Sequence, residues 1–169
     1  MVGMSCPYCE KSLAHTPLIC KIFSAPITSF SGKYRFLSNF WPAKVVFEGV
    51  EYPSVENAYQ AAKTLDLNER VAFQTATAGQ AKKASHKLKI RPDWEEIKIS
   101  VMEGLLCQKF SDIVLLKKLR STENRLLVEG NTWHDNFGGD CSCGINLGCV
   151  KSGKNNLGQL LMKIRDNQP

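Results

Sequence analysis

Residues 53–63 constrain the fold most, because their spacing fits one helix whose two faces differ in chemistry. Proline and serine at the beginning are typical of a helix start, where the hydroxyl of Ser54 can accept a hydrogen bond from a free backbone N–H. At about 100° per residue, small apolar residues gather on one side of the helix. The other side collects four polar side chains: Glu56, Tyr59, Gln60 and Lys63. Such a face is either solvated surface or the wall of a polar pocket, and the helix alone fits both.

The composition is that of an ordinary globular domain. The chain has 169 residues, of which 43% are hydrophobic and 22% are charged. No apolar run approaches the roughly 20 residues that a membrane-spanning helix needs. The first residues also lack the charged start and apolar core of a signal peptide. We therefore expect a soluble, cytoplasmic protein with no membrane partner.

The positive charge is unevenly distributed. The net charge is +6, and residues 81–125 alone hold eleven Lys or Arg against six Asp or Glu. A local excess of this kind suits ligands that carry phosphate, such as nucleotides, sugar phosphates or a nucleic acid backbone. It also suits a face that only keeps the protein soluble, so charge alone does not identify a ligand.

Seven cysteines in a chain without a secretion signal favour free thiols or metal ligands over disulfides. Residues 1–25 look like an extension, with residues 26–169 as the domain proper. In this extension, a C-x2-C-x5-H-x4-C spacing, one residue away from that of a zinc knuckle, comes from Cys6, Cys9, His15 and Cys20. The extension is either ordered by zinc or a disordered tail.

A second group of cysteines lies near the C-terminus. Cys141, Cys143 and Cys149 offer three zinc ligands, and Cys6 or Cys9 can supply a fourth across the fold. Structural zinc is thus one expectation, and chance spacing is the other. Cys107 lies within a predicted helix and is expected in the core.

The rest of the chain predicts an α+β domain that is mainly α-helical, with a small antiparallel sheet. Apolar segments on either side of a Glu-Gly turn predict a hairpin over residues 45–52. Residues 27–30 and 126–130 predict short strands. Helical periodicity and capping residues predict further helices over 69–75 (capped by Asn68), 77–88, 93–110, 112–119 and 157–164.

Residues 131–156 form a long polar loop that is the second candidate for chemistry. Trp133, His134 and Asp135 place an aromatic plane, an imidazole and a carboxylate side by side. Asp135 can steer a water molecule or stabilise positive charge, and Trp133 can stack on a base. The alternative is a turn that Asp135 caps. Patterns typical of P-loop or Rossmann nucleotide binding, zincins and serine hydrolases are absent from the sequence.

These segments together resemble the NADAR (YbiA-like) family over about residues 27–166. The resemblance rests on Phe-Leu-Ser-Asn-Phe at 36–40, Tyr-Pro-Ser-Val-Glu-Asn-Ala-Tyr-Gln-Ala-Ala-Lys at 52–63, Ala-Lys-Lys at 81–83, Asp-Trp at 93–94 with Met102, Lys-Phe at 109–110, Leu-Val-Glu-Gly at 127–130, Asp135, and residues 156–165. It implies the YbiA-like fold and N-glycosidase chemistry on ribosyl substrates. Members include hydrolases of phosphorylated early riboflavin intermediates and enzymes that remove ADP-ribose from guanine in DNA, in phage and bacterial genomes.

The resemblance implies roles for particular residues. Cleavage of a ribose C1′–N bond passes through an oxocarbenium-like sugar, which needs a nearby carboxylate and assistance to the leaving group. Glu56 and Asp135 would stabilise that cation and activate water. Lys63 would bind phosphate, protonate the leaving group or capture the opened ribose as a Schiff base. Substrate-binding side chains would be Arg35, Ser38, Asn39, Tyr59, Gln60, Lys82, Trp94 and Trp133. Catalysis would need no cofactor, and for Trp94 core packing is an equal interpretation.

The sequence departs from the family pattern at one position. The family usually reads D-x-[YF]-W-G after the loop aspartate, whereas this chain has Gly138 in place of the tryptophan. This leaves three hypotheses. The first is an N-glycosidase acting on an ADP-ribosyl or phosphoribosyl substrate, either free or carried on DNA. The second is a non-catalytic binder of ADP-ribose or NAD-derived ligands. The third is a zinc-bearing nucleic-acid-binding module.

Overall fold

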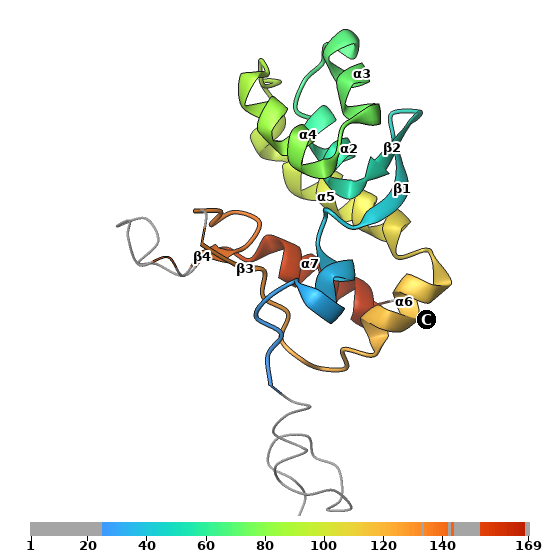
Figure 1. Cartoon of the computed structure of the whole chain (residues 1–169), viewed down its shortest axis with the longest axis vertical. Coiled ribbons are helices and arrows are strands. Elements are labelled where there is room, and N and C mark those ends of the chain that lie inside the picture. The colour runs from blue at the N-terminus through green and yellow to red at the C-terminus, as the bar shows by residue number, and fades with distance from the viewer. Residues whose placement is uncertain (1–24, 133, 142, 144–152, 168–169) are drawn as a thin grey trace, which may run out of the picture.

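A computed structural model describes residues 25–132, 134–141, 143 and 153–167 (Figure 1). The elements in chain order are η1 (Gly32–Leu37), β1 (Pro42–Phe47), β2 (Val50–Ser54), α2 (Val55–Ala61), α3 (Leu67–Thr75), α4 (Ala78–Ala84), η2 (Ser85–Lys87), α5 (Trp94–Lys109), α6 (Ile113–Arg120), β3 (Gly130–Asn131), β4 (Asp140–Cys141) and α7 (Asn156–Asn167). The α+β, mainly helical class is confirmed. Among the described helices, none is long and apolar enough to cross a membrane. The predicted extension, with Cys6, Cys9, His15 and Cys20, lies outside the described residues.

The β1–β2 hairpin forms where the sequence predicts it. Its strands pair antiparallel, with Phe47 opposite Val50. The two turn residues, Glu48 and Gly49, have φ angles of 47° and 80°. Two positive φ values in a two-residue loop are typical of the turns that match the twist of antiparallel strands. The hairpin leads straight into α2, so its register determines where α2 begins.

Helix α2 lies at the centre of the first half of the fold, and every one of its residues is buried. Ser54 caps it as predicted, because its hydroxyl accepts a hydrogen bond from the Asn57 N–H at 3.2 Å. The Asn57 amide in turn donates to the carbonyls of Phe73 (2.9 Å) and Ala76 (2.8 Å), which joins α2 to the end of α3. The helix is shorter than the predicted 53–63, because it begins at Val55 and ends at Ala61.

Helix α5 is the long core helix that its apolar spacing predicts. Met102, Leu105 and Leu106 are buried along it. Figure 1 shows α2, α3, α4 and the hairpin on one side of α5, with α6, α7 and the β3–β4 pair on the other. One expectation here is wrong: Cys107 is exposed, because it faces away from the buried stripe.

The predicted helix caps are partly correct. Thr77, the predicted first residue of its helix, forms a capping box with Gln80. Of the two candidate caps for α6, Ser111 and Asp112, it is Asp112 that accepts hydrogen bonds from the second and third residues of the helix. The cap of α3 is Asp66 instead of Asn68: its carboxylate accepts a hydrogen bond from the Asn68 N–H at 2.8 Å, so the helix begins two residues earlier than predicted.

The strands predicted over 27–30 and 126–130 are shorter than expected. Ile27 and Leu127 form only an isolated parallel bridge. Further on, β3 and β4 pair in parallel over two residues each, with Asn131 opposite Cys141. Within the described residues, the strands therefore form one antiparallel hairpin and a minimal parallel pair, which lies in the first part of the polar loop.

Replacing Asn57 with alanine should destabilise the fold strongly. The side chain is fully buried, and its loss leaves the Phe73 and Ala76 carbonyls without partners. We expect the free energy of unfolding to fall by about 3 kcal/mol, measured by chemical denaturation. The control is Gln74→Ala on the exposed side of α3, which should stay within about 0.5 kcal/mol of the original chain. A similarly small effect for Asn57→Ala would contradict the bridging role.

Candidate active site

A pocket of about 920 Å³ opens where the polar face of α2 meets the polar loop. It is lined by residues of η1 and its flanks, the polar face of α2, Lys82 of α4, the N-terminal half of α5, and residues 129–138. Five separate segments of the described sequence therefore converge on one cavity, within residues 29–40, 56–63, 82, 94–102 and 129–138. Its size is in the range of sites that hold nucleotide-sized ligands, roughly 300–1,000 Å³.

The polar face of α2 forms one wall of this pocket, so the pocket interpretation of that face is correct. Glu56 is 5% exposed and Gln60 is 4% exposed, and the Gln60 amide donates a hydrogen bond of 2.7 Å to the Glu56 carboxylate. The Glu56 N–H donates to the Asn39 carbonyl at 3.0 Å, which attaches the start of α2 to the segment after η1. Burial raises the pKa of Glu56, and the positive charges of Lys82 and Lys63 oppose that rise.

Two buried acceptors in the pocket wall have no hydrogen-bond partner within the described part of the chain. They are Oδ1 of Asn39 and Oε1 of Gln60. A buried polar atom without a partner costs free energy, which a ligand that donates hydrogen bonds would recover. Sugar hydroxyls and base amino groups are donors of this kind.

Lys63 follows α2 in the next turn and also lines the pocket. Burial lowers the pKa of its amine. Its backbone is held by a hydrogen bond from the Arg91 N–H to the Lys63 carbonyl at 2.7 Å. A lysine with a lowered pKa keeps more of its neutral, nucleophilic form near pH 7 than an exposed lysine does.

The aromatic pair Tyr59 and Trp94 forms an inner wall of the pocket. The ring centroids are 5.0 Å apart with the planes tilted by 59°. Trp94 is 7% exposed, so it packs in the core and still lines the cavity, and the two interpretations of this residue coincide. Burial raises the pKa of Tyr59, so its hydroxyl stays protonated and can donate a hydrogen bond.

Asp135 lines the pocket and caps the turn that follows it, as one of its two interpretations predicts. Its Oδ1 accepts hydrogen bonds from the N–H groups of Phe137 (3.2 Å) and Gly138 (2.8 Å), which makes it a turn cap. Its Oδ2 forms a salt bridge of 3.3 Å with Lys82 Nζ. The Asn131 amide clamps the Asp135 backbone through two hydrogen bonds, of 2.8 and 3.1 Å. The carboxylate is thus fixed at the pocket edge.

Glu129 is a pocket residue that the sequence analysis did not single out. It lies in the Leu-Val-Glu-Gly segment of the family resemblance, which was the only signal for it. Burial, with the Asp135 carboxylate nearby, raises the pKa of Glu129 to about 7. Burial also lowers the pKa of Lys109 to about 7, and this amine donates to the Ser38 carbonyl at 2.7 Å. The pocket therefore holds three carboxyl groups, those of Glu56, Glu129 and Asp135.

The remaining predicted residues divide into three groups. Arg35, Ser38, Asn39 and Lys82 line the pocket as expected. Cys141 and Cys143 do not line it and lie beside His134 instead. Outside the described residues are Trp133, Cys6, Cys9 and Cys149.

The sequence and fold are similar to those of known YbiA proteins. N-glycosidase YbiA from Escherichia coli is 36% identical over 146 residues, which cover 82% of this chain and 84% of YbiA. The NMR structure of E. coli YbiA superposes with a TM-score of 0.71 at 30% identity, covering 85% of this chain and 84% of that one. A riboflavin biosynthesis protein from Vibrio vulnificus is 34% identical over 138 residues, 79% of this chain and 35% of that protein.

The NADAR domain family matches residues 27–167. This chain therefore belongs to the NADAR domain family. The family resemblance found in the sequence is confirmed, and the names of the relatives support the expectation of N-glycosidase chemistry.

The raised pKa of Glu129 predicts a pH-dependent effect of Glu129→Gln on stability. A carboxyl group whose pKa is about 7 when folded, against an ordinary 4.5, makes the folded state less stable as pH rises from about 4.5 to 7. Glutamine removes this loss. The variant should therefore gain stability relative to the original chain between pH 5 and pH 8, measured by urea denaturation at both values.

The control for this test is Glu96→Gln, which removes an exposed carboxylate from the first turn of α5. Its stability difference from the original chain should be the same at both pH values. A Glu129→Gln difference that is equally constant would contradict the raised pKa.

Proposed function

We propose that this protein is an N-glycosidase that hydrolyses the bond between ribose C1′ and a base nitrogen. The substrate is an ADP-ribosylated or phosphoribosylated base, either ADP-ribosyl-guanine in DNA or an early riboflavin-pathway ribosylaminopyrimidine phosphate. The observation that carries this proposal is the cavity in which the carboxyl groups of Glu56, Asp135 and Glu129 meet.

The carboxyl groups differ in surroundings, which supports a division of roles. Asp135 is paired with Lys82 and held by two backbone N–H groups, so it is suited to stabilise a cationic ribose. Glu56 is buried and has a raised pKa, so it is suited to exchange a proton with the attacking water. Lys63 lies on the same wall, where it would protonate the leaving base or capture the opened sugar.

Cations at the pocket account for phosphate recognition. Arg35, Lys82 and Lys98 line the cavity, and Arg35 is exposed at its surface. Lys98 lies 4.2 Å from the centroid of the Phe137 ring, which places its charge over the polar loop. Phosphate groups on the substrate would occupy this cationic side while the C1′–N bond faces the carboxyl groups.

The second candidate is a binder of ADP-ribose or NAD-derived ligands without catalysis, and Gly138 favours it. A Cβ atom at this position would lie 3.3 Å from Glu129 Oε2 and 3.4 Å from Asp135 Oδ2. The tryptophan usual in the family would therefore begin beside the two carboxyl groups, and glycine leaves them without an aromatic cover. A ligand can bind there with less base stacking.

Glu56→Gln should abolish most glycosidase activity. The substitution keeps the shape and the hydrogen bonding with Gln60 but removes the proton-transfer group. We expect kcat to fall by about 10²–10⁴-fold, measured as free base released from ADP-ribosylated guanine DNA and from the ribosylaminopyrimidine phosphate. Release by the original chain from one of the two identifies the substrate. Full activity in Glu56→Gln would refute the assignment, and binding without release by the original chain would support the second candidate.

Gly138→Trp tests whether the missing aromatic plane weakens binding. Base stacking on an aromatic side chain is worth about 1–3 kcal/mol, so Kd for the substrate identified above should fall roughly 5- to 150-fold. Gly138→Ala is the matched control, since it adds the Cβ contact with Glu129 and Asp135 without a ring. Equal affinities for the two variants would show that stacking at this position is unimportant in this chain.

A further inference from the structure

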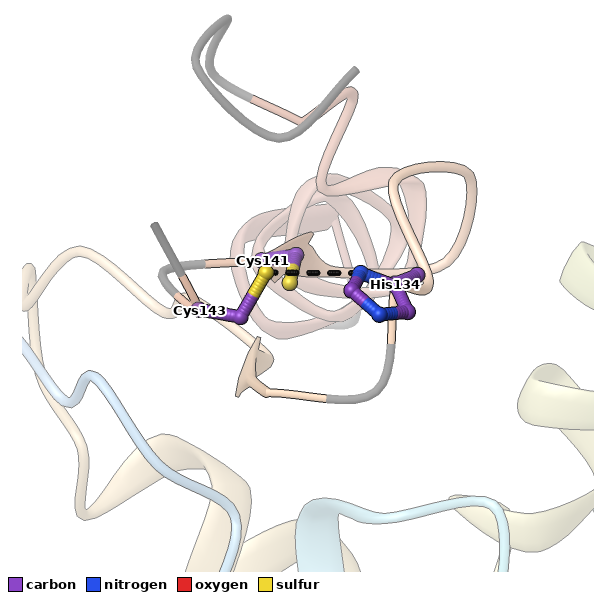
Figure 2. A group of neighbouring side chains, drawn as sticks. All are labelled: His134, Cys141 and Cys143. Carbon is purple, nitrogen blue, oxygen red and sulfur yellow. Dashed lines mark hydrogen bonds between the residues drawn. The ribbon is translucent and has the colours of Figure 1, made fainter. Parts of the chain in front are cut away.

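His134, Cys141 and Cys143 form a cluster that the proposed catalysis does not use (Figure 2). One ligand atom from each lies within 4.8 Å of the others. Cys143 Sγ and His134 Nδ1 are 3.3 Å apart. Figure 2 shows the imidazole and the two thiols turned toward a common point between the β4 segment and the loop that carries His134.

The hydrogen bonding of the polar loop brings these residues together. The β3–β4 pairing sets Asn131 opposite Cys141, so the loop between them returns to its starting point. The Asn136 side chain accepts a hydrogen bond of 3.0 Å from the Cys141 N–H, and the Asn131 clamp on Asp135 fixes the other side. His134 has a φ of 65°, a left-handed conformation that is uncommon outside glycine and turns its side chain toward the cysteines.

The dimensions fit a tetrahedral metal ion. Around a tetrahedral zinc ion, Zn–S bonds are about 2.3 Å long and Zn–N bonds are about 2.0 Å long. Neighbouring ligand atoms are then roughly 3.5–3.8 Å apart. One spacing here is 3.3 Å and none exceeds 4.8 Å, so the ligand atoms need to move by about 1 Å or less to bind such an ion. Cys141 is buried, Cys143 is partly buried and His134 is exposed, so the site has a fixed base and an open approach.

We propose that His134, Cys141 and Cys143 bind a zinc ion. Two thiolates and one imidazole are the ligand types that select zinc over the oxygen-seeking cations magnesium and calcium. Three protein ligands leave the fourth tetrahedral position for water or another donor. The ion would have a structural role and not a catalytic one, because none of its three ligands lines the cavity.

The bound ion would fix the backbone next to a pocket residue. His134 directly precedes Asp135, and Cys141 directly follows the Asp140 whose carboxylate accepts a hydrogen bond of 2.6 Å from the Gly153 N–H. Zinc would therefore link both ends of the segment that presents Asp135 to the pocket. The proposal concerns metal binding alone and does not depend on the glycosidase proposal.

Cobalt titration of the full chain provides the test. The reduced, chelator-treated protein is titrated with Co²⁺, whose d–d bands report tetrahedral geometry and whose sulfur charge-transfer band scales with the number of thiolates. We expect one equivalent that zinc displaces and that Cys141→Ser/Cys143→Ser binds about 100-fold more weakly. His134→Gln, a change at an exposed side chain that leaves the core intact, should also weaken binding and shift the d–d bands.

Two control variants distinguish this site from other thiols. Cys107→Ser alters an exposed cysteine on α5, and Cys6→Ser/Cys9→Ser alters the N-terminal pair. Both should keep the cobalt spectrum of the proposed site. An original chain that binds no tetrahedral cobalt, or a spectrum that survives in Cys141→Ser/Cys143→Ser and in His134→Gln, would overturn the proposal.

Discussion

The burial of α2 on both of its faces is the constraint on which the other elements depend. Its apolar side, with Val55, Ala58 and Ala61 fully buried, packs in the core beside α3, α4 and α5. Its polar side also leaves bulk water, and a buried carboxyl group such as Glu56 needs hydrogen bonds and opposite charge nearby. Gln60, Lys63 and Lys82 meet that need. The pocket exists because α2 carries polar groups into the interior and other segments complete their surroundings.

The second organising feature is the contrast between Asp135 and Glu129. Two carboxyl groups at close range cannot both be ionised without a cost. Asp135 receives a lysine and two backbone N–H groups, whereas Glu129 lies in a more buried place where its proton is retained to near neutral pH. Neighbouring carboxyl groups in such different surroundings are suited to different roles in acid–base catalysis. The arrangement is built by the loop, while α2 supplies the opposite wall.

Much of the fold follows from the sequence where the signal is local. The hairpin turn, the Thr77 and Asp112 caps and the stripe of α5 each depend on residues a few positions apart. The predicted cap of α3 is wrong because Asp66 and Asn68 are both good capping residues, and only the conformation of the preceding turn decides between them. The short strands at 27–30 and 126–130 pair with segments far along the chain, so periodicity overestimates their length.

The candidate active site, like the fold, is predictable from the sequence only where the signal is local. The residue types on α2 are readable from helical spacing, but their enclosure is not, because it depends on residues 129–138 and on Lys82. Glu129 is hidden for this reason: its pKa arises from burial and from Asp135. The grouping of His134 with Cys141 and Cys143 also follows from a two-residue parallel pairing that leaves no periodic trace in the sequence.

The absence of a side chain at Gly138 has a thermodynamic consequence for ligand binding. A Cβ atom here would lie 3.3 Å from Glu129 Oε2 and 3.4 Å from Asp135 Oδ2, and burial raises the pKa of Glu129 to about 7. An anionic ligand entering the pocket raises the proton affinity of Glu129 further, so binding draws protons from the solution. The heat of binding then includes the ionisation enthalpy of the buffer. The apparent affinity for a phosphate-bearing ligand also increases as the pH is lowered, until Glu129 is fully protonated before the ligand binds.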